Sequence, residues 1–120
     1  MTRAKPLSFD DVWRVGLTLP DVEQGTAWGV PALRAAGKVL ACVARHRSAE
    51  PDSLIVMLPV ESREALIAEQ PDVYYVTEHY VPHNCVVARL SRLRKDALRD
   101  LLLMGHRYVT RARAGRSTRT

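Results

Sequence analysis

Residues 23–43 constrain the fold more than any other part of this chain, because they place two turn signals between runs of β-forming residues. Gly29 can adopt backbone angles closed to other residues. Pro31 fixes φ at about −65° and has no amide donor, so the chain must bend between two strands. Ala36-Gly37, followed by Lys38, is a second candidate for a tight turn. We expect Trp28 to pack beside the first bend as part of a small core; the alternative is that it forms the floor of a recognition surface.

The rest of the chain predicts helices and further strands around this segment. Ser8 is a helix N-cap, with Asp10 and Asp11 in the first turn and Pro20 near the end. Residues 38–43 and 54–58 are almost continuously apolar, which is typical of central strands. Strands are expected at 22–28, 31–36, 38–45, 54–58, 73–77 and 85–90, and further helices at 61–70 and about 95–110. This α-β4-α-β2-α order predicts an α+β fold, with a largely antiparallel sheet packed against terminal helices.

Helical periodicity indicates which faces of the two later helices point inward. On the helix at 61–70, we expect Ala65, Leu66 and Ala68 to face the core. The last helix carries one apolar stripe, and the glycine within it predicts a close approach of this helix to the sheet. The stripe consists of Leu98, Leu101, Leu102, Gly105 and Val109. Two apolar residues lie well away from the stripe: Leu103 and Met104. Such residues are most often scattered surface positions; our hypothesis is that they mark a homo-oligomer or partner contact.

Length and charge predict one domain with a basic end. The 120 residues suit a single domain at 1–110, and the formal charge is +5. Four arginines lie in residues 111–120, so the rest of the chain has a formal charge of only 5 − 4 = +1. We expect 111–120 to be a disordered basic tail. The chain shows no membrane span and no signal-peptide core, so we expect a cytoplasmic protein in which Cys42 and Cys85 are free thiols.

Few residues indicate chemistry. His79, His83 and Cys85 form a dense group of possible metal ligands, but their spacing resembles no standard zinc pattern. The chain contains no nucleophile elbow, P-loop or dinucleotide-binding glycine motif. We therefore expect no metal site, no cofactor and no enzymatic activity.

Two surfaces remain as candidate binding sites. The first consists of basic residues at the predicted turns, which could lie along DNA phosphates: Arg34, Lys38, Arg45 and Arg47. Charge alone favours the simpler interpretation that they keep the hairpin tips soluble. The second is a ligand or partner surface formed by Trp28, His79 and Tyr80. Tyr74 and Tyr75 lie on opposite faces of their strand, so at most one of them needs to be in the core.

Taken together, several motifs resemble the MmcQ/YjbR family of small bacterial proteins over about residues 8–110. The matching motifs occur in the family's order and spacing. They are Glu23-x-Gly-Thr-x-Trp-Gly-x-Pro-Ala-x-Arg34, Gly37-Lys38, Ala65-Leu66 before Pro71, Tyr75-Val-Thr-x-His-Tyr80, Val87-x-Arg-Leu90 and Leu98-Arg-x-Leu-Leu102.

The resemblance implies a fold similar to the CyaY/frataxin α+β sandwich and DNA binding through a "double wing" of two hairpins. Carried onto this chain, it implicates Arg34, Lys38, Arg45 and Arg47. We therefore expect a non-enzymatic protein that binds DNA with low specificity through these residues and the arginine-rich tail. The alternative is a small-molecule or protein-interaction module that uses the Trp28 and Tyr80 surface.

Overall fold

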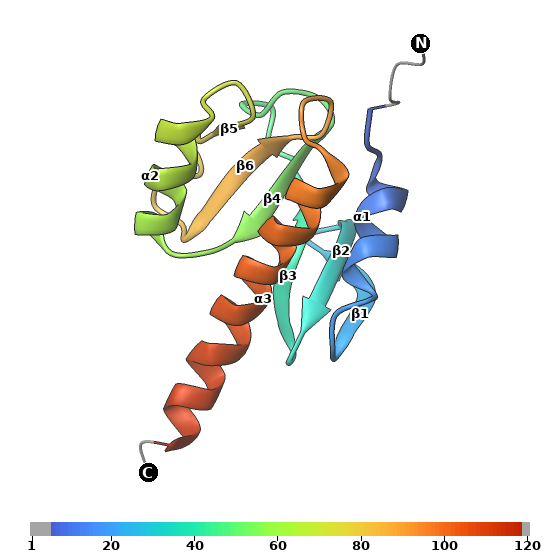
Figure 1. The fold of residues 1–120 in the computed structure, drawn as a ribbon, viewed down its shortest axis with the longest axis vertical. Coiled ribbons are helices and arrows are strands. Elements are labelled where there is room, and N and C mark those ends of the chain that lie inside the picture. The colour runs from blue at the N-terminus through green and yellow to red at the C-terminus, as the bar shows by residue number, and fades with distance from the viewer. Residues whose placement is uncertain (1–5, 119–120) are drawn as a thin grey trace.

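A computed structural model describes the backbone of residues 6–118 and the side chains of residues 6–111. Three helices and six strands follow one another along this part of the chain (Figure 1). The helices are α1 (Phe9–Gly16), α2 (Val60–Glu69) and α3 (Lys95–Thr118). The strands are β1 (Val22–Ala27), β2 (Val30–Ala35), β3 (Lys38–Val43), β4 (Ser53–Met57), β5 (Tyr74–Tyr75) and β6 (Cys85–Arg89).

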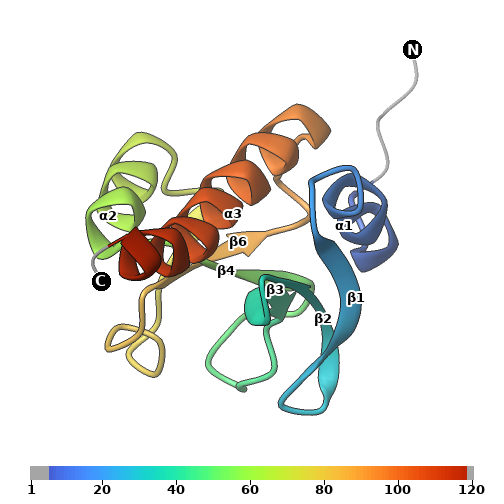
Figure 2. The same cartoon turned by 90° about the horizontal axis from the view of Figure 1, so that it is seen from below.

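The strands form one six-stranded sheet in the order β1-β2-β3-β4-β6-β5, and each neighbouring pair is antiparallel. Figure 2 shows the helices on one side of this sheet. Three connections extend on the other side: the β1–β2 turn (28–29), the β3–β4 loop (44–52) and the segment before β6 (76–84). The predicted α+β class and antiparallel sheet are confirmed. So is the central position of β3 and β4.

Both predicted turn signals form tight hairpins. Trp28 and Gly29 connect β1 to β2 with φ of 52° and 80°, and Ala36 and Gly37 connect β2 to β3 with φ of 54° and 76°. Two successive residues with positive φ define the type I′ turn, whose twist matches that of the flanking strands. The register then pairs Thr26 with Pro31.

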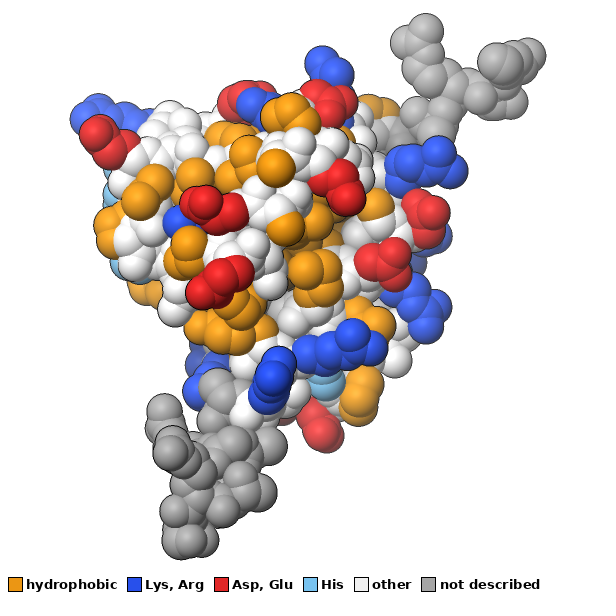
Figure 3. Space-filling view, turned by 60° about the vertical axis from the view of Figure 1, so that its left-hand side comes forward, with side chains coloured by type: hydrophobic (Ala, Val, Ile, Leu, Met, Phe, Trp, Pro, Cys, Tyr) orange, Lys and Arg blue, Asp and Glu red, His pale blue; other side chains and the backbone are white. Residues whose placement is uncertain are grey.

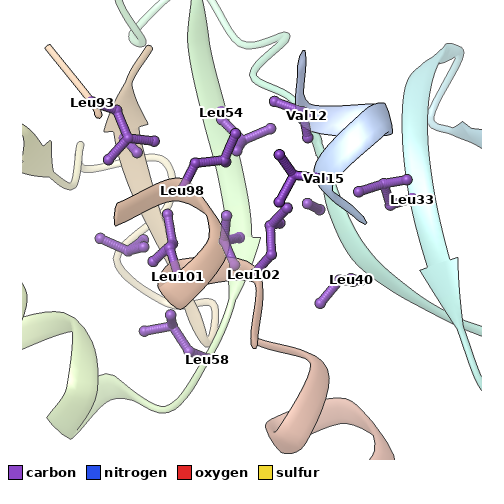
Figure 4. Packing of buried hydrophobic residues seen from close by; sticks show 14 of the residues in the cluster. Val12, Val15, Leu33, Leu40, Leu54, Leu58, Leu93, Leu98, Leu101 and Leu102 are labelled. Carbon is purple, nitrogen blue, oxygen red and sulfur yellow. The ribbon is translucent and has the colours of Figure 1, made fainter. Parts of the chain in front are cut away.

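A helix-side core fills the space between the helices and the sheet. In Figure 4, leucines of α3 meet valines of α1 and leucines of β2, β3 and β4. Leu54, Leu98 and Leu102 are completely buried there. Burial of a leucine side chain stabilises a fold by about 1.5–3 kcal/mol, so this cluster anchors α3 across the sheet.

The glycine in the apolar stripe of α3 has the predicted role. A Cβ atom on Gly105 would lie 2.9 Å from Leu40 Cδ1, from Val56 Cγ1 and from the Met57 carbonyl oxygen. The helix backbone therefore rests directly on β3 and β4, which confirms the expected close approach.

Three local expectations need correction. On α2, Ala65 and Ala68 are exposed, whereas Arg63 is buried and Leu66 is half-buried. The strand expected at 73–77 is reduced to Tyr74–Tyr75. α3 extends to Thr118, beyond its predicted end near 110. Because the side chains beyond residue 111 lie outside the described residues, the separate basic tail at 111–120 stays a prediction.

The outer surface of the helices is mixed in character. Figure 3 shows acidic and basic groups interspersed with hydrophobic groups on the side of α2 and α3. Leu103 and Met104 are half-buried, and Leu103 packs against the helix-side core. Self-association through these two residues stays a prediction. Within the described part of the chain, no helix has the length and apolar character needed to cross a membrane.

Candidate functional site: a cavity on the open face of the sheet

The sheet face opposite the helices carries a cavity of about 720 Å³, which we call the open-face cavity. Its floor is formed by strands, and its rim by the β1–β2 turn, the β3–β4 loop and the segment before β6. The lining residues are Trp28, Val30, Cys42, Val43, Arg45, His46, Arg47, Ile55, Met57, His79, Tyr80, His83 and Cys85. The volume lies within the range of about 300–1,000 Å³ typical of small-molecule sites.

Strand alternation in β4 produces the apolar floor. Leu54 and Val56 face the helix-side core, so Ile55 between them faces the opposite side, where it pairs with Cys42 of β3. Cys85 extends this surface on β6. Burial raises the pKa of Cys42 and of Cys85 to about 11, so both thiols are protonated at neutral pH. The floor is therefore uncharged, and its thiols are poor nucleophiles.

Hydrogen bonds join the two loops that form one side of the cavity. The backbone N–H of His46 donates to the Tyr80 hydroxyl oxygen at 3.2 Å, and the Ser48 and Thr77 hydroxyl oxygens lie 2.8 Å apart. These contacts cross 34 and 29 residues of sequence, respectively. They hold the β3–β4 loop against the segment before β6.

Two imidazole rings stack between the same loops. The ring centroids of His46 and His79 are 3.6 Å apart, and the ring planes differ by 8°. Tyr80 presents its ring edgewise to His79 at 4.8 Å, and His83 lies 6.3 Å from His79. We call the first pair the histidine stack. Partial desolvation lowers the pKa of His46, and the neighbouring His79 and Arg47 lower it further. Therefore, His46 is mainly neutral at pH 7.

Trp28 is exposed, not packed in a core. Its side chain is 66% exposed at the tip of the β1–β2 hairpin, where it lines the cavity. At a central position of a type I′ turn, the side chain projects beyond the end of the sheet, away from the helix-side core. Arg45 fixes this tip by donating from Nη1 to the Trp28 carbonyl oxygen at 2.6 Å. The expectation that Trp28 packs in a small core is therefore wrong. The exposed position of Trp28 agrees with the alternative, in which it is part of a surface.

The structure separates the four candidate DNA-binding residues into two groups. Arg45 and Arg47 line the open-face cavity, together with Trp28, His79 and Tyr80. Arg34 and Lys38 flank the Ala36–Gly37 turn at the other end of β3, and Arg34 Nη2 donates to the Gly37 carbonyl oxygen at 3.1 Å. The six residues of β3 place the two groups about 20 Å apart.

A buried arginine supports the cavity from α2. Arg63 is only 3% exposed, and its guanidinium donates to the carbonyl oxygens of His83 at 2.9 Å, Cys85 at 3.1 Å and Val81 at 3.3 Å. Its Nε has no hydrogen-bond partner within the described residues. Arg63 therefore fixes the backbone that leads from the cavity rim into β6.

Tyr75 anchors the far end of the β3–β4 loop. Its hydroxyl oxygen accepts from the Glu50 backbone N–H at 2.8 Å and lies 2.7 Å from the Ser53 hydroxyl. The Arg89 guanidinium lies 4.2 Å from the ring centroid and forms an ion pair with Glu50 at 2.7 Å. This hydrogen-bonded pairing lowers the pKa of Glu50. As expected, only one residue of the tyrosine pair, Tyr74, is in the helix-side core.

Sequence reasoning placed Trp28, His79 and Tyr80 on one surface, and the structure brings them together. It missed His46, Arg63 and the strand residues of the floor. Alternation in β4 could have identified Ile55 as facing away from Leu54. In β3, Cys42 follows Leu40 by two residues, so alternation alone would place both on one face; the register shift between β2 and β3 separates them. The histidine stack had no sequence signal, because its rings are 33 residues apart (79 − 46) and meet only through loop packing.

The fold and the cavity define a small α+β domain with an open sheet face. Among the described residues, no group of three or more His, Cys, Asp or Glu side chains is placed to hold a metal ion. The family model described as YjbR matches residues 17–108. The chain therefore belongs to the YjbR family. Searches of curated proteins and of solved structures gave no significant match.

Proposed function

We propose that this chain is a non-enzymatic binding protein that holds a small, partly apolar molecule in the open-face cavity. One observation carries the proposal: a concave apolar floor lies beside a tryptophan that is 66% exposed. Large apolar side chains grouped on an exposed surface often mark binding sites. In contrast, the other large hydrophobic residues that are exposed in the described part of the chain, Leu17 and Val81, lie outside the cavity lining.

The cavity also has the organisation of a ligand site. Its floor comes from rigid strands, whereas its polar groups come from loops that are tied together by hydrogen bonds. Small-molecule sites commonly combine an apolar lining with a few polar groups that orient the ligand. An eight-carbon alkyl chain that fills part of the floor would gain about 5–6 kcal/mol, at about 0.8 kcal/mol per CH₂. This gain alone corresponds to a dissociation constant of about 40–200 micromolar.

Fluorescence titration with 1-octanol tests the proposal. The chain contains two tryptophans, and Trp13 packs against the helix-side core. Saturable quenching should therefore come from Trp28 and disappear in Trp28→Phe. Trp28→Ala should weaken binding, measured by calorimetry, by about tenfold, whereas the matched control Leu17→Ala should leave it unchanged. Equal binding by wild type and Trp28→Ala would contradict the cavity as the site.

Low-specificity DNA binding is the second candidate function. The observation that favours it is the placement of four basic residues at two ends of one strand, where they could follow a phosphate backbone over about 20 Å. These residues are Arg34, Lys38, Arg45 and Arg47. In the full chain, Arg34→Gln with Lys38→Gln should reduce the salt slope of duplex binding by about 2, and Arg107→Gln is the control. An unchanged slope would exclude the β2–β3 turn as a DNA contact.

A further inference from the structure

The rim of the open-face cavity is basic and contains no carboxylate. Its lining includes Arg45, Arg47 and three histidines, but no Asp or Glu. Arg45 already donates to the Trp28 carbonyl oxygen. In contrast, Arg47 is exposed and forms no hydrogen bond or ion pair within the described residues. The free guanidinium of Arg47 is therefore available to a ligand.

The contacts of His46 define its tautomer. The Ser48 backbone N–H donates to His46 Nδ1 at 3.1 Å, so Nδ1 carries a lone pair and no proton. The neutral ring must therefore carry its proton on Nε2, where it acts as a donor. Protonation of Nδ1 would break the bond from Ser48, which also contacts this ring through its hydroxyl at 2.8 Å.

The histidine stack can hold one positive charge more readily than two. Two imidazolium rings with centroids 3.6 Å apart would repel each other, whereas an imidazolium on a neutral ring would not. The charged or titratable groups that line the cavity beside the stack are Arg45 and Arg47 on the β3–β4 loop, Tyr80 and His83 on the segment before β6, and the two thiols of the floor.

We propose that the cavity binds an amphipathic monoanion, and this inference rests on the proposed function. The ligand is a molecule that combines an apolar chain or ring system with one carboxylate. Its apolar part lies on the floor formed by Val30, Ile55 and Met57. The carboxylate lies at Arg47 and the histidine stack. A duplex DNA would use the cations but not the apolar floor. A free small molecule is also favoured over a lipid surface, because the apolar residues line a concavity.

Calorimetry with three eight-carbon probes at pH 6, 7 and 8 tests the head group. Octanoate, 1-octanol and octylamine share one chain and differ in charge. At pH 6, octanoate should bind at least about tenfold more tightly than 1-octanol, as expected for charge-assisted hydrogen bonds, and octylamine should bind more weakly. The octanoate advantage should be present at all three pH values, because the carboxylate of octanoate is ionised throughout this range.

Two exposed residues allow matched variants that should fold normally. Arg47→Gln should remove most of the octanoate preference at all three pH values. His79→Gln should weaken the preference, because it removes one ring of the histidine stack. Arg107→Gln on α3 removes one exposed arginine outside the cavity and should behave as wild type. Circular dichroism checks that each variant is folded.

The outcomes separate this inference from the proposed function. Equal affinities for octanoate and 1-octanol, both weakened in Trp28→Ala, would overturn the carboxylate site and leave the cavity as an apolar site. Failure of all three probes to bind would overturn both proposals. Octanoate binding that is unchanged in Arg47→Gln and His79→Gln would overturn the assigned head-group position. Co-sedimentation with phosphatidylglycerol vesicles, without binding of free octanoate, would replace the small molecule with a lipid surface.

Discussion

Replacement of Gly105 by alanine should destabilise the fold, although alanine is the better helix former. An added Cβ would meet Leu40 Cδ1, Val56 Cγ1 and the Met57 carbonyl oxygen, each at 2.9 Å. Leu40 and Val56 are completely buried, Val56 is β-branched and stiff, and the Met57 oxygen belongs to the sheet backbone. None of the three atoms can move aside easily, so α3 must shift outward.

The two opposing effects can be compared in magnitude. Overpacking of a core costs about 1–3 kcal/mol, and three simultaneous contacts favour the upper end of this range. The gain in helix propensity is about 1 kcal/mol. We expect a net loss of about 2 kcal/mol in the free energy of unfolding, which is a substantial part of the stability of a small domain.

Urea unfolding followed by far-UV circular dichroism measures this loss as a lower midpoint at an unchanged m-value. Arg107→Ala is the matched control, because it adds alanine to the same helix at an exposed position and should change stability by less than about 0.5 kcal/mol. A Gly105→Ala protein that is as stable as wild type, or more stable, would refute the close contact between α3 and the sheet.

Two further predictions concern buried groups. Arg63→Met should reduce the free energy of unfolding by about 2–4 kcal/mol, because it removes the guanidinium that donates to three carbonyl oxygens. Glu64→Gln on the exposed side of α2 is the control. Equal urea midpoints for Arg63→Met and wild type would contradict the supporting role of Arg63. Burial raises the pKa of Cys42 and Cys85 from 9.0 to about 11, so the stability that these thiols contribute is present below pH 9 and is lost as the pH rises through about 11. Unfolding of Cys42→Ala with Cys85→Ala should therefore depend less steeply on pH between 9 and 11, and an unchanged slope would show that the thiols are not buried as described.

The strands and hairpins could be predicted from the sequence because their determinants are local. Ala36-Gly37 and Trp28-Gly29 occupy the positive-φ positions of type I′ turns, and the apolar runs of β3 and β4 require central places in the sheet. The role of Gly105 could also be predicted from the sequence. A glycine within the apolar stripe of a helix lowers the helix propensity, and a close contact with the sheet explains why it stands there.

The cavity was harder to predict because it depends on contacts between distant segments. Apolar character suggested a core position for Trp28, but its place in the turn directs it outward, and hydrophobic residues are not always buried. Arg63 on α2 was not expected to be buried, since its partners are carbonyl oxygens about 20 residues away that carry no sequence signal. The histidine stack likewise depends on how two loops meet.

Amide chemical-shift mapping of the full chain distinguishes ligand binding in the open-face cavity from DNA binding at the hairpins. Octanoate and a short DNA duplex are titrated separately into isotope-labelled protein at moderate salt. Octanoate should shift residues 28–30, 42–47 and 79–85 around the open-face cavity and leave the Ala36–Gly37 turn unchanged. Octanoate shifts that are absent from the cavity, with DNA shifts centred on Arg34 and Lys38, would contradict ligand binding in the cavity and favour DNA binding through the hairpins.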